Sequence, residues 1–133
     1  MTISAPLTLS AINSILKNKW RQPWLDFHLH RFNGYELIIA GSHDFSYYHN
    51  IEIIAQSPIN IQGNTEWSTG IELKFLKAIS TPDLTPTEPV RIMQFYSDDG
   101  LELTITAESF TYNLDTVFYY ERENLQSGER MDK

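Results

Sequence analysis

Two histidines, His28 and His30, are the residues whose types and spacing best suit chemistry. Side chains at positions i and i+2 of a strand project from the same face, so two imidazoles at this spacing can share a metal ion. His43, His49 and Glu36 are candidate further ligands. The alternative is that both histidines pack across strands or lie on the surface. The pattern favours this alternative, because metal-binding histidines usually have carboxylate partners and none is expected opposite this pair.

Two other groups contain catalytic residue types but have simpler explanations. Asp98 and Asp99 precede Gly100, as expected for a hairpin turn in which aspartates bond the local backbone. A general acid–base pair needs a cleft that perturbs its pKa values, and a hairpin tip does not provide one. Residues 42–44 read Ser-His-Asp, but neighbours on a strand point apart and cannot form a hydrolytic triad. We therefore predict no catalytic residue, which favours a protein that is not an enzyme.

Aromatic residues are the candidates for binding a partner. Tyr47 and Tyr48 are consecutive, and Trp67 lies near the end of a predicted strand. Adjacent residues of a strand face opposite sides, so one tyrosine of the pair is expected at the surface. Exposed tyrosine and tryptophan dominate binding hot spots. We predict contacts through Tyr47, Tyr48, Trp67 and the proline-rich loop 80–89, whereas the structural alternative treats the aromatic residues as good strand formers.

Composition narrows the class of partner. The formal net charge is −7, so phosphate backbones and anionic membranes repel the chain, whereas a basic protein is attracted. The absence of cysteine excludes disulfides, thiolate metal sites and a cysteine nucleophile. The first residues do not resemble a signal peptide, and no apolar run is long enough to span a membrane. We expect a cytoplasmic protein that binds neither nucleic acid nor membrane and carries no cofactor.

The elements that must position these residues begin with a helix over about 10–21. Ser10 is the predicted N-cap and Pro23 ends the helix. The apolar residues recur at helical spacing and should cover one face of a sheet: Ile12, Ile15, Leu16 and Trp20.

Residues 25–42 predict a β-hairpin. Asn33-Gly34 is a strong signal for a two-residue turn, because both central residues of a type I′ turn need positive φ. This register places His28 opposite Ile39 and His30 opposite Leu37. Both faces of the pair are then partly apolar, as in strands that are covered on two sides.

Residues 90–108 predict a second hairpin. A three-residue loop 98–100 sets Phe95 against Leu103 and Met93 against Ile105, which pairs apolar with apolar. A two-residue loop would pair them with threonines instead. We therefore predict the longer loop and a bulge at the turn.

Strands and turns at this spacing indicate a mainly β protein with one N-terminal helix. We expect an antiparallel sandwich or a partly closed barrel of about seven or eight strands. One globular domain covers residues 1–121, and a frayed polar tail covers residues 122–133. Ser57-Pro58 is expected to interrupt the strand that begins at Ile51, with alternation resuming at Ile59 and Ile61.

Three runs carry a family resemblance: YELIIAGSHDFSYYHNIEIIAQSPINI, IELKFLKAIS and LELTITAESFTYN. Their rhythm resembles small uncharacterised bacterial β-rich proteins, including toxin-immunity-type families. The resemblance implies a non-enzymatic protein whose acidic surface occupies a cognate partner, and it assigns a role to no individual residue.

The leading prediction is thus a non-catalytic bacterial protein-interaction domain, with an immunity-type protein as its narrower form. One alternative is a β-barrel that binds a small ligand, or a metal through His28 and His30. Another is a homo-oligomer that associates through an edge strand.

Overall fold

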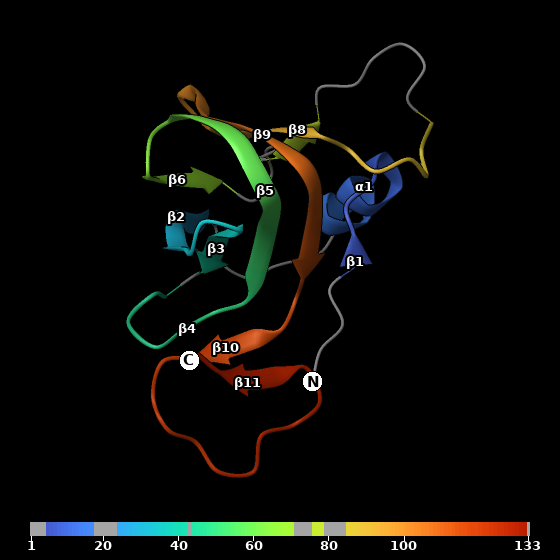
Figure 1. The fold of residues 1–133 in the computed structure, drawn as a ribbon. Coiled ribbons are helices and arrows are strands. Elements are labelled where there is room, and N and C mark those ends of the chain that lie inside the picture. The colour runs from blue at the N-terminus through green and yellow to red at the C-terminus, as the bar shows by residue number, and fades with distance from the viewer. Residues whose placement is uncertain (1–4, 18–23, 43, 71–75, 79–84, 133) are drawn as a thin grey trace.

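A curled antiparallel sheet makes up most of the described chain (Figure 1). The structure is a computed structural model that describes residues 5–17, 24–42, 44–70, 76–78 and 85–132. Its elements are β1 (Ala5–Pro6), α1 (Leu9–Lys17), β2 (Trp24–Phe32), β3 (Glu36–Ser42), β4 (Tyr48–His49), β5 (Ile51–Gly63), β6 (Glu66–Gly70), β7 (Leu76–Ala78), β8 (Ile92–Ser97), β9 (Gly100–Asn113), β10 (Thr116–Phe118) and β11 (Glu129–Met131).

The large sheet has the order β6-β2-β3-β5-β9-β8-β7, and β1 pairs with β9. It curls into a half-barrel, while β11, β10 and β4 form a small second sheet at one end (Figure 1). The predicted class, mainly β with one N-terminal helix and a partly closed barrel, is confirmed. The described residues contain more strands than predicted because several are pieces of only two or three residues, which alternation cannot reveal.

The core fills the concave side of the curled sheet. Its largest fully buried side chains include Phe27, Phe95 and Phe110. Ile12 and Ile15 of α1 join this cluster, as the helical spacing predicted. The predicted N-cap Ser10 is wrong: the helix begins earlier, and the Thr8 hydroxyl accepts a hydrogen bond from the backbone N–H of Ala11 (3.1 Å). Trp20 lies outside the described residues, as do residues 71–75 and 80–84.

The predicted register of the β2–β3 hairpin is wrong. Phe32 lies opposite Leu37, and the Asn33 side chain accepts the backbone N–H groups of Tyr35 and Glu36, which moves the turn one residue onward. A bulge between Leu29 and Arg31 then shifts the pairing again, so that His28 lies opposite Ala40. His30 is the extra residue of this bulge, and a bulge redirects the side chain that it carries.

The β8–β9 hairpin shows the predicted apolar pairs. Phe95 lies opposite Leu103 and Met93 opposite Ile105, with a bulge next to the turn. The predicted three-residue loop is wrong: Ser97 pairs with Gly100 and Tyr96 with Leu101, so the loop has two residues, and the bulge lies at Glu102 and not at Gly100. Local alternation therefore identified the pairing of the hydrophobic face but not the residue that bulges.

Two expected interruptions are continuous structure instead. Strand β5 runs through Ser57-Pro58 with a register shift between Pro58 and Asn60, so the proline marks a bulge and not a strand end. Within the tail that was expected to fray, β11 pairs in parallel with β10. The C-terminal segment is thus part of the small sheet.

Candidate functional site

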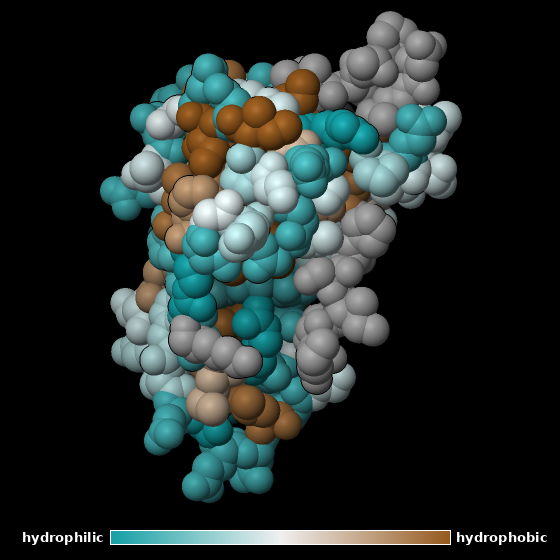
Figure 2. All heavy atoms as spheres, viewed as in Figure 1, coloured by the Kyte–Doolittle hydropathy of each residue, from teal (hydrophilic) through white to brown (hydrophobic). Residues whose placement is uncertain are grey.

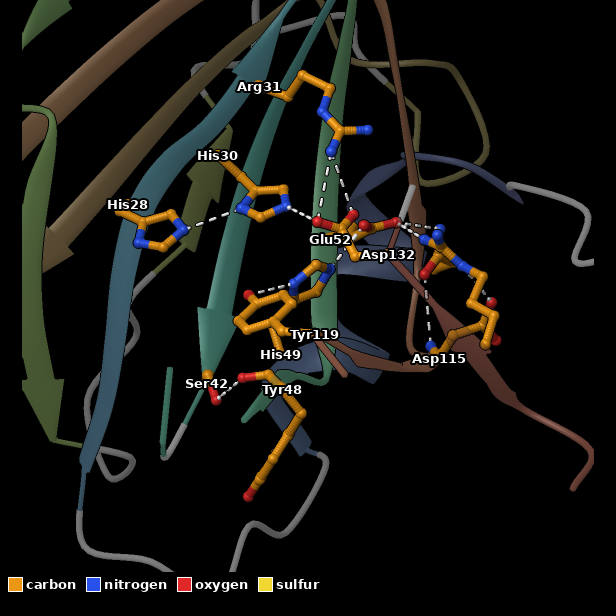
Figure 3. A network of polar contacts seen from close by, with 12 residues as sticks. His28, His30, Arg31, Ser42, Tyr48, His49, Glu52, Asp115, Tyr119 and Asp132 are labelled. Atoms are coloured by element: carbon orange, nitrogen blue, oxygen red, sulfur yellow. Dashed lines mark hydrogen bonds and ion pairs between the residues drawn. The ribbon is translucent and has the colours of Figure 1, made fainter. Parts of the chain in front are cut away.

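His28, His30 and His49 meet in a polar network between the large and small sheets (Figure 3). His28 Nε2 lies 3.1 Å from His30 Nδ1, and His30 Nε2 lies 3.2 Å from Asp132 Oδ2. The Arg31 guanidinium also donates to this carboxylate, at 3.3 Å. The β2 bulge and the C-terminal strand therefore position these side chains together.

A second part of the network centres on Glu52. The Glu52 carboxylate and the His49 ring are buried, whereas Arg130 is partly exposed. His49 Nε2 lies 2.7 Å from Glu52 Oε2, and His49 Nδ1 lies 2.6 Å from the Tyr119 hydroxyl oxygen. The Asn113 amide donates to Glu52 Oε1 at 2.8 Å, and the Arg130 guanidinium contacts the same oxygen. Arg130 therefore connects the C-terminal strand to the centre of the protein.

The surroundings shift the pKa values of these groups in different directions. Burial by itself would raise the pKa of Glu52, but hydrogen bonds from His49 and Asn113 and the charge of Arg130 outweigh it and lower that pKa. Burial, followed by the neighbouring imidazoles, lowers the pKa values of His28 and His30. The pair is therefore held largely neutral at neutral pH.

The order Tyr119, His49, Glu52 is that of a nucleophile, a base and an orienting carboxylate. Burial and the nearby Asp132 and Glu52 carboxylates raise the pKa of the Tyr119 hydroxyl. This shift makes the phenol harder to deprotonate and disfavours Tyr119 as a nucleophile. The saturated hydrogen bonding of Glu52 is typical of a structural anchor.

The structure brings together His28 and His30, the predicted metal pair. The His49 ring lies edge-on to His30, with centroids 4.8 Å apart, but its nitrogens contact Tyr119 and Glu52. Within the described ranges, no group of three or more His, Asp or Glu side chains is arranged to hold a metal ion. The Glu36 carboxylate instead accepts a hydrogen bond from the Gln56 amide, and His43 lies outside the described residues. Metal binding by the pair stays a prediction.

The three predicted binding aromatics have different environments. Tyr47 is 58% exposed and Tyr48 is half-buried. Trp67, expected at the surface, is instead a core residue with 8% exposure. Its ring stacks on Phe27 and packs against Phe95, both with centroids 5.7 Å away, because Trp67 is the cross-strand partner of the buried Phe27.

Tyr120, which the predicted binding residues did not include, is 47% exposed. Its ring contacts that of Tyr47 edge-on, with centroids 6.3 Å apart and an interplanar angle of 90°. Phe118 lies between Tyr120 and Tyr48, with ring centroids 5.7 and 6.4 Å from theirs. We call Tyr47, Tyr48 and Tyr120, together with the buried Phe118 ring that contacts Tyr48 and Tyr120, the aromatic surface. Tyr119 and Tyr120 are consecutive, a pattern that predicts one exposed tyrosine, but the sequence does not indicate that Tyr120 lies beside Tyr47.

Hydrophobic side chains also gather elsewhere. Figure 2 shows one group over the upper end of β5 and a smaller one over the small sheet. Ile59, Ile61 and Leu101 are exposed in the first region. Their chemistry is purely aliphatic, whereas the aromatic surface combines rings, hydroxyls and nearby charges, so the aromatic surface is the better candidate for specific contacts.

Comparisons with known proteins identify no relative. No protein-family model matches the chain, no curated protein matches it, and no solved structure matches it. The resemblance to immunity-type families therefore stays a prediction. Among the described residues, no helix has the length and apolar character needed to cross a membrane.

Proposed function

We propose that this protein is a non-catalytic interaction domain that binds a basic protein through the aromatic surface. The observation that carries the proposal is the edge-on contact between Tyr47 and Tyr120. These tyrosines lie far apart in the sequence and are both about half exposed, at 58% and 47%. Tyrosine supplies a large amphipathic contact area at low entropic cost, which is why it is enriched at hot spots.

Backbone hydrogen bonds support these rings. The backbone N–H of Tyr119 donates to the Tyr47 carbonyl at 2.9 Å, next to the pairing of Tyr48 with Phe118. The Tyr47 N–H donates in turn to the carbonyl of Asp44. A surface held in this way needs little ordering when a partner binds, which leaves more of the contact energy for affinity.

Charge favours a basic partner. Exposed carboxylates lie beside the aromatic surface in the sequence, at Asp44, Glu121 and Glu123. The guanidinium of Arg122 lies over the Phe118 ring at 4.1 Å, so an aromatic face already engages this cation. A lysine or arginine of the partner can pack on a tyrosine face while these carboxylates and the net charge of −7 attract it.

The test is to compare capture by matched variants. Wild type, Tyr47→Ala/Tyr120→Ala and Tyr35→Ala are used to capture proteins from lysate of the source organism. Tyr35 is 76% exposed in the β2–β3 turn and controls for loss of an exposed tyrosine. We expect the double variant to lose more than tenfold in affinity, since each hot-spot residue contributes about 2 kcal/mol or more. The control should bind like wild type.

A photocrosslinking residue at position 47 or at position 35 then separates contact from an indirect effect. The proposal requires one basic protein that crosslinks from position 47 only and whose binding weakens as salt rises. Undiminished capture by the double variant, or equal crosslinking from both positions, would refute it. The immunity-type form of the proposal adds that the captured protein is a toxin whose activity falls on binding.

A further inference from the structure

A separate open pocket lies over strands β2 and β6. Its volume is about 460 Å³, within the roughly 300–1,000 Å³ typical of small-molecule sites. The lining residues are Asp26, Phe27, His28, Phe45, Glu66, Trp67 and Ser68. Three consecutive cross-strand pairs supply six of them, because Asp26 pairs with Ser68, Phe27 with Trp67 and His28 with Glu66.

Strand alternation separates these pairs into two faces. Phe27 and Trp67 stack on each other in the core, so the side chains of the neighbouring pairs occupy the other face of the sheet. That face carries Asp26 and Glu66, which are diagonal neighbours at roughly 7–8 Å, close enough to reach one ligand. Phe45 forms a wall by stacking on the His28 ring, with centroids 3.9 Å apart.

The two carboxylates have few partners. Asp26 accepts a hydrogen bond from the Ser68 hydroxyl at 2.6 Å. In the part of the chain that the structure describes, neither Asp26 nor Glu66 forms an ion pair with a lysine or an arginine. Their charges are therefore available to a ligand, and the aromatic wall beside them can contact the apolar part of that ligand.

The geometry points to a binding site for an organic cation, an ammonium or guanidinium group held between Asp26 and Glu66 against the Phe45–His28 wall. His28 does not oppose such a ligand at neutral pH, because burial and the neighbouring His30 lower its pKa and keep the ring neutral. The cation is either a free small molecule or a basic side chain of a protein. This site shares no residue with the aromatic surface and stands independently of the proposed function.

The experiment titrates the full chain with n-butylguanidinium, n-butylammonium and choline, followed by amide chemical shifts. The uncharged isostere of choline, 3,3-dimethylbutan-1-ol, is the control ligand. We expect at least one cation to bind saturably, with the largest shifts in residues 26–28 and 66–68. The variant Asp26→Asn/Glu66→Gln should bind that cation at least tenfold more weakly. The control variant Asp99→Asn/Glu108→Gln makes the same change in net charge at exposed positions and should bind it like wild type.

Three results would overturn the inference: no saturable binding of any cation, equal binding of choline and its isostere, or equal weakening by both double variants. Saturable Zn²⁺ binding that His28→Ala abolishes, without binding of the organic cations, would also replace it with a metal site. Capture of the protein partner by Asp26→Asn/Glu66→Gln identifies the source of the cation. Weakened capture assigns a side chain of that partner, whereas unchanged capture assigns a free small molecule, and cation binding supports the pocket in both cases.

Discussion

His49 and Glu52 form a buried pair, with 2.7 Å between His49 Nε2 and Glu52 Oε2 and side-chain exposures of 0% and 3%. The pair joins β4 of the small sheet to β5 of the large one. Arg130 of β11 contacts the same carboxylate, so three segments depend on one glutamate. Removing one member of such a group leaves the others buried without compensation.

Glu52→Ala should therefore lower the free energy of unfolding by about 3 kcal/mol, the usual cost of removing one partner from a buried pair. Urea unfolding followed by circular dichroism measures this change. Glu108→Ala, an exposed glutamate on β9, is the control and should stay within about 0.5 kcal/mol of wild type. Equal small effects of the two substitutions would show that the Glu52 network contributes nothing to stability.

The lowered pKa values of His28 and His30 predict that stability falls on mild acidification. The unfolded chain takes up protons near the ordinary histidine pKa of about 6.5, whereas the folded pair resists protonation to lower pH, so acid favours unfolding. The free energy of unfolding should decrease as pH falls from 7.5 to 5.5. His28→Gln/His30→Gln should flatten this dependence, and an unchanged slope in that variant would contradict the assignment.

Substitutions of Trp67 distinguish a role in core packing from a role in partner binding. Trp67→Ala should cost about 3–5 kcal/mol, because it removes a ring that packs on Phe27 and Phe95. Trp67→Phe keeps an aromatic ring and deletes the buried indole N–H, which has no hydrogen-bond partner in the described residues, so it should cost less than about 1.5 kcal/mol. Both are measured by thermal unfolding. A stable Trp67→Ala that loses partner capture would restore Trp67 as a binding residue.

Gly63 and Gly34 differ in their surroundings but share a positive φ, at 134° and 93°. A Cβ at Gly63 would meet the backbone of Glu102 and Leu103, whereas a Cβ at Gly34 meets nothing within 4 Å. Gly34→Ala should cost about 1–2 kcal/mol for the left-handed conformation. Gly63→Ala should cost at least about 1 kcal/mol more, because backbone atoms cannot move aside as flexible side chains do. Equal urea-unfolding midpoints for Gly34→Ala and Gly63→Ala would contradict this prediction.

Local patterns in the sequence determined the mainly β class, the N-terminal helix and the pairing of Phe95 with Leu103. These features depend on alternation, helical spacing and turn residues within about 20 positions, where side-chain period and turn chemistry act directly. The sequence also marked His28 and His30 as a pair on one side of a strand. None of these inferences depended on contacts between residues that are distant in the sequence.

Only the tertiary structure decided the partners of those residues. His30 meets Asp132 across a separation of 102 residues, and Arg130 meets Glu52 across 78. No local pattern encodes such contacts, because they follow from how the sheet curls and where the last strand adds to it. The same curl buries Trp67 and exposes the Tyr47–Tyr120 contact. Burial of an aromatic residue depends on the layers around it, and a strand's own sequence does not specify its layers.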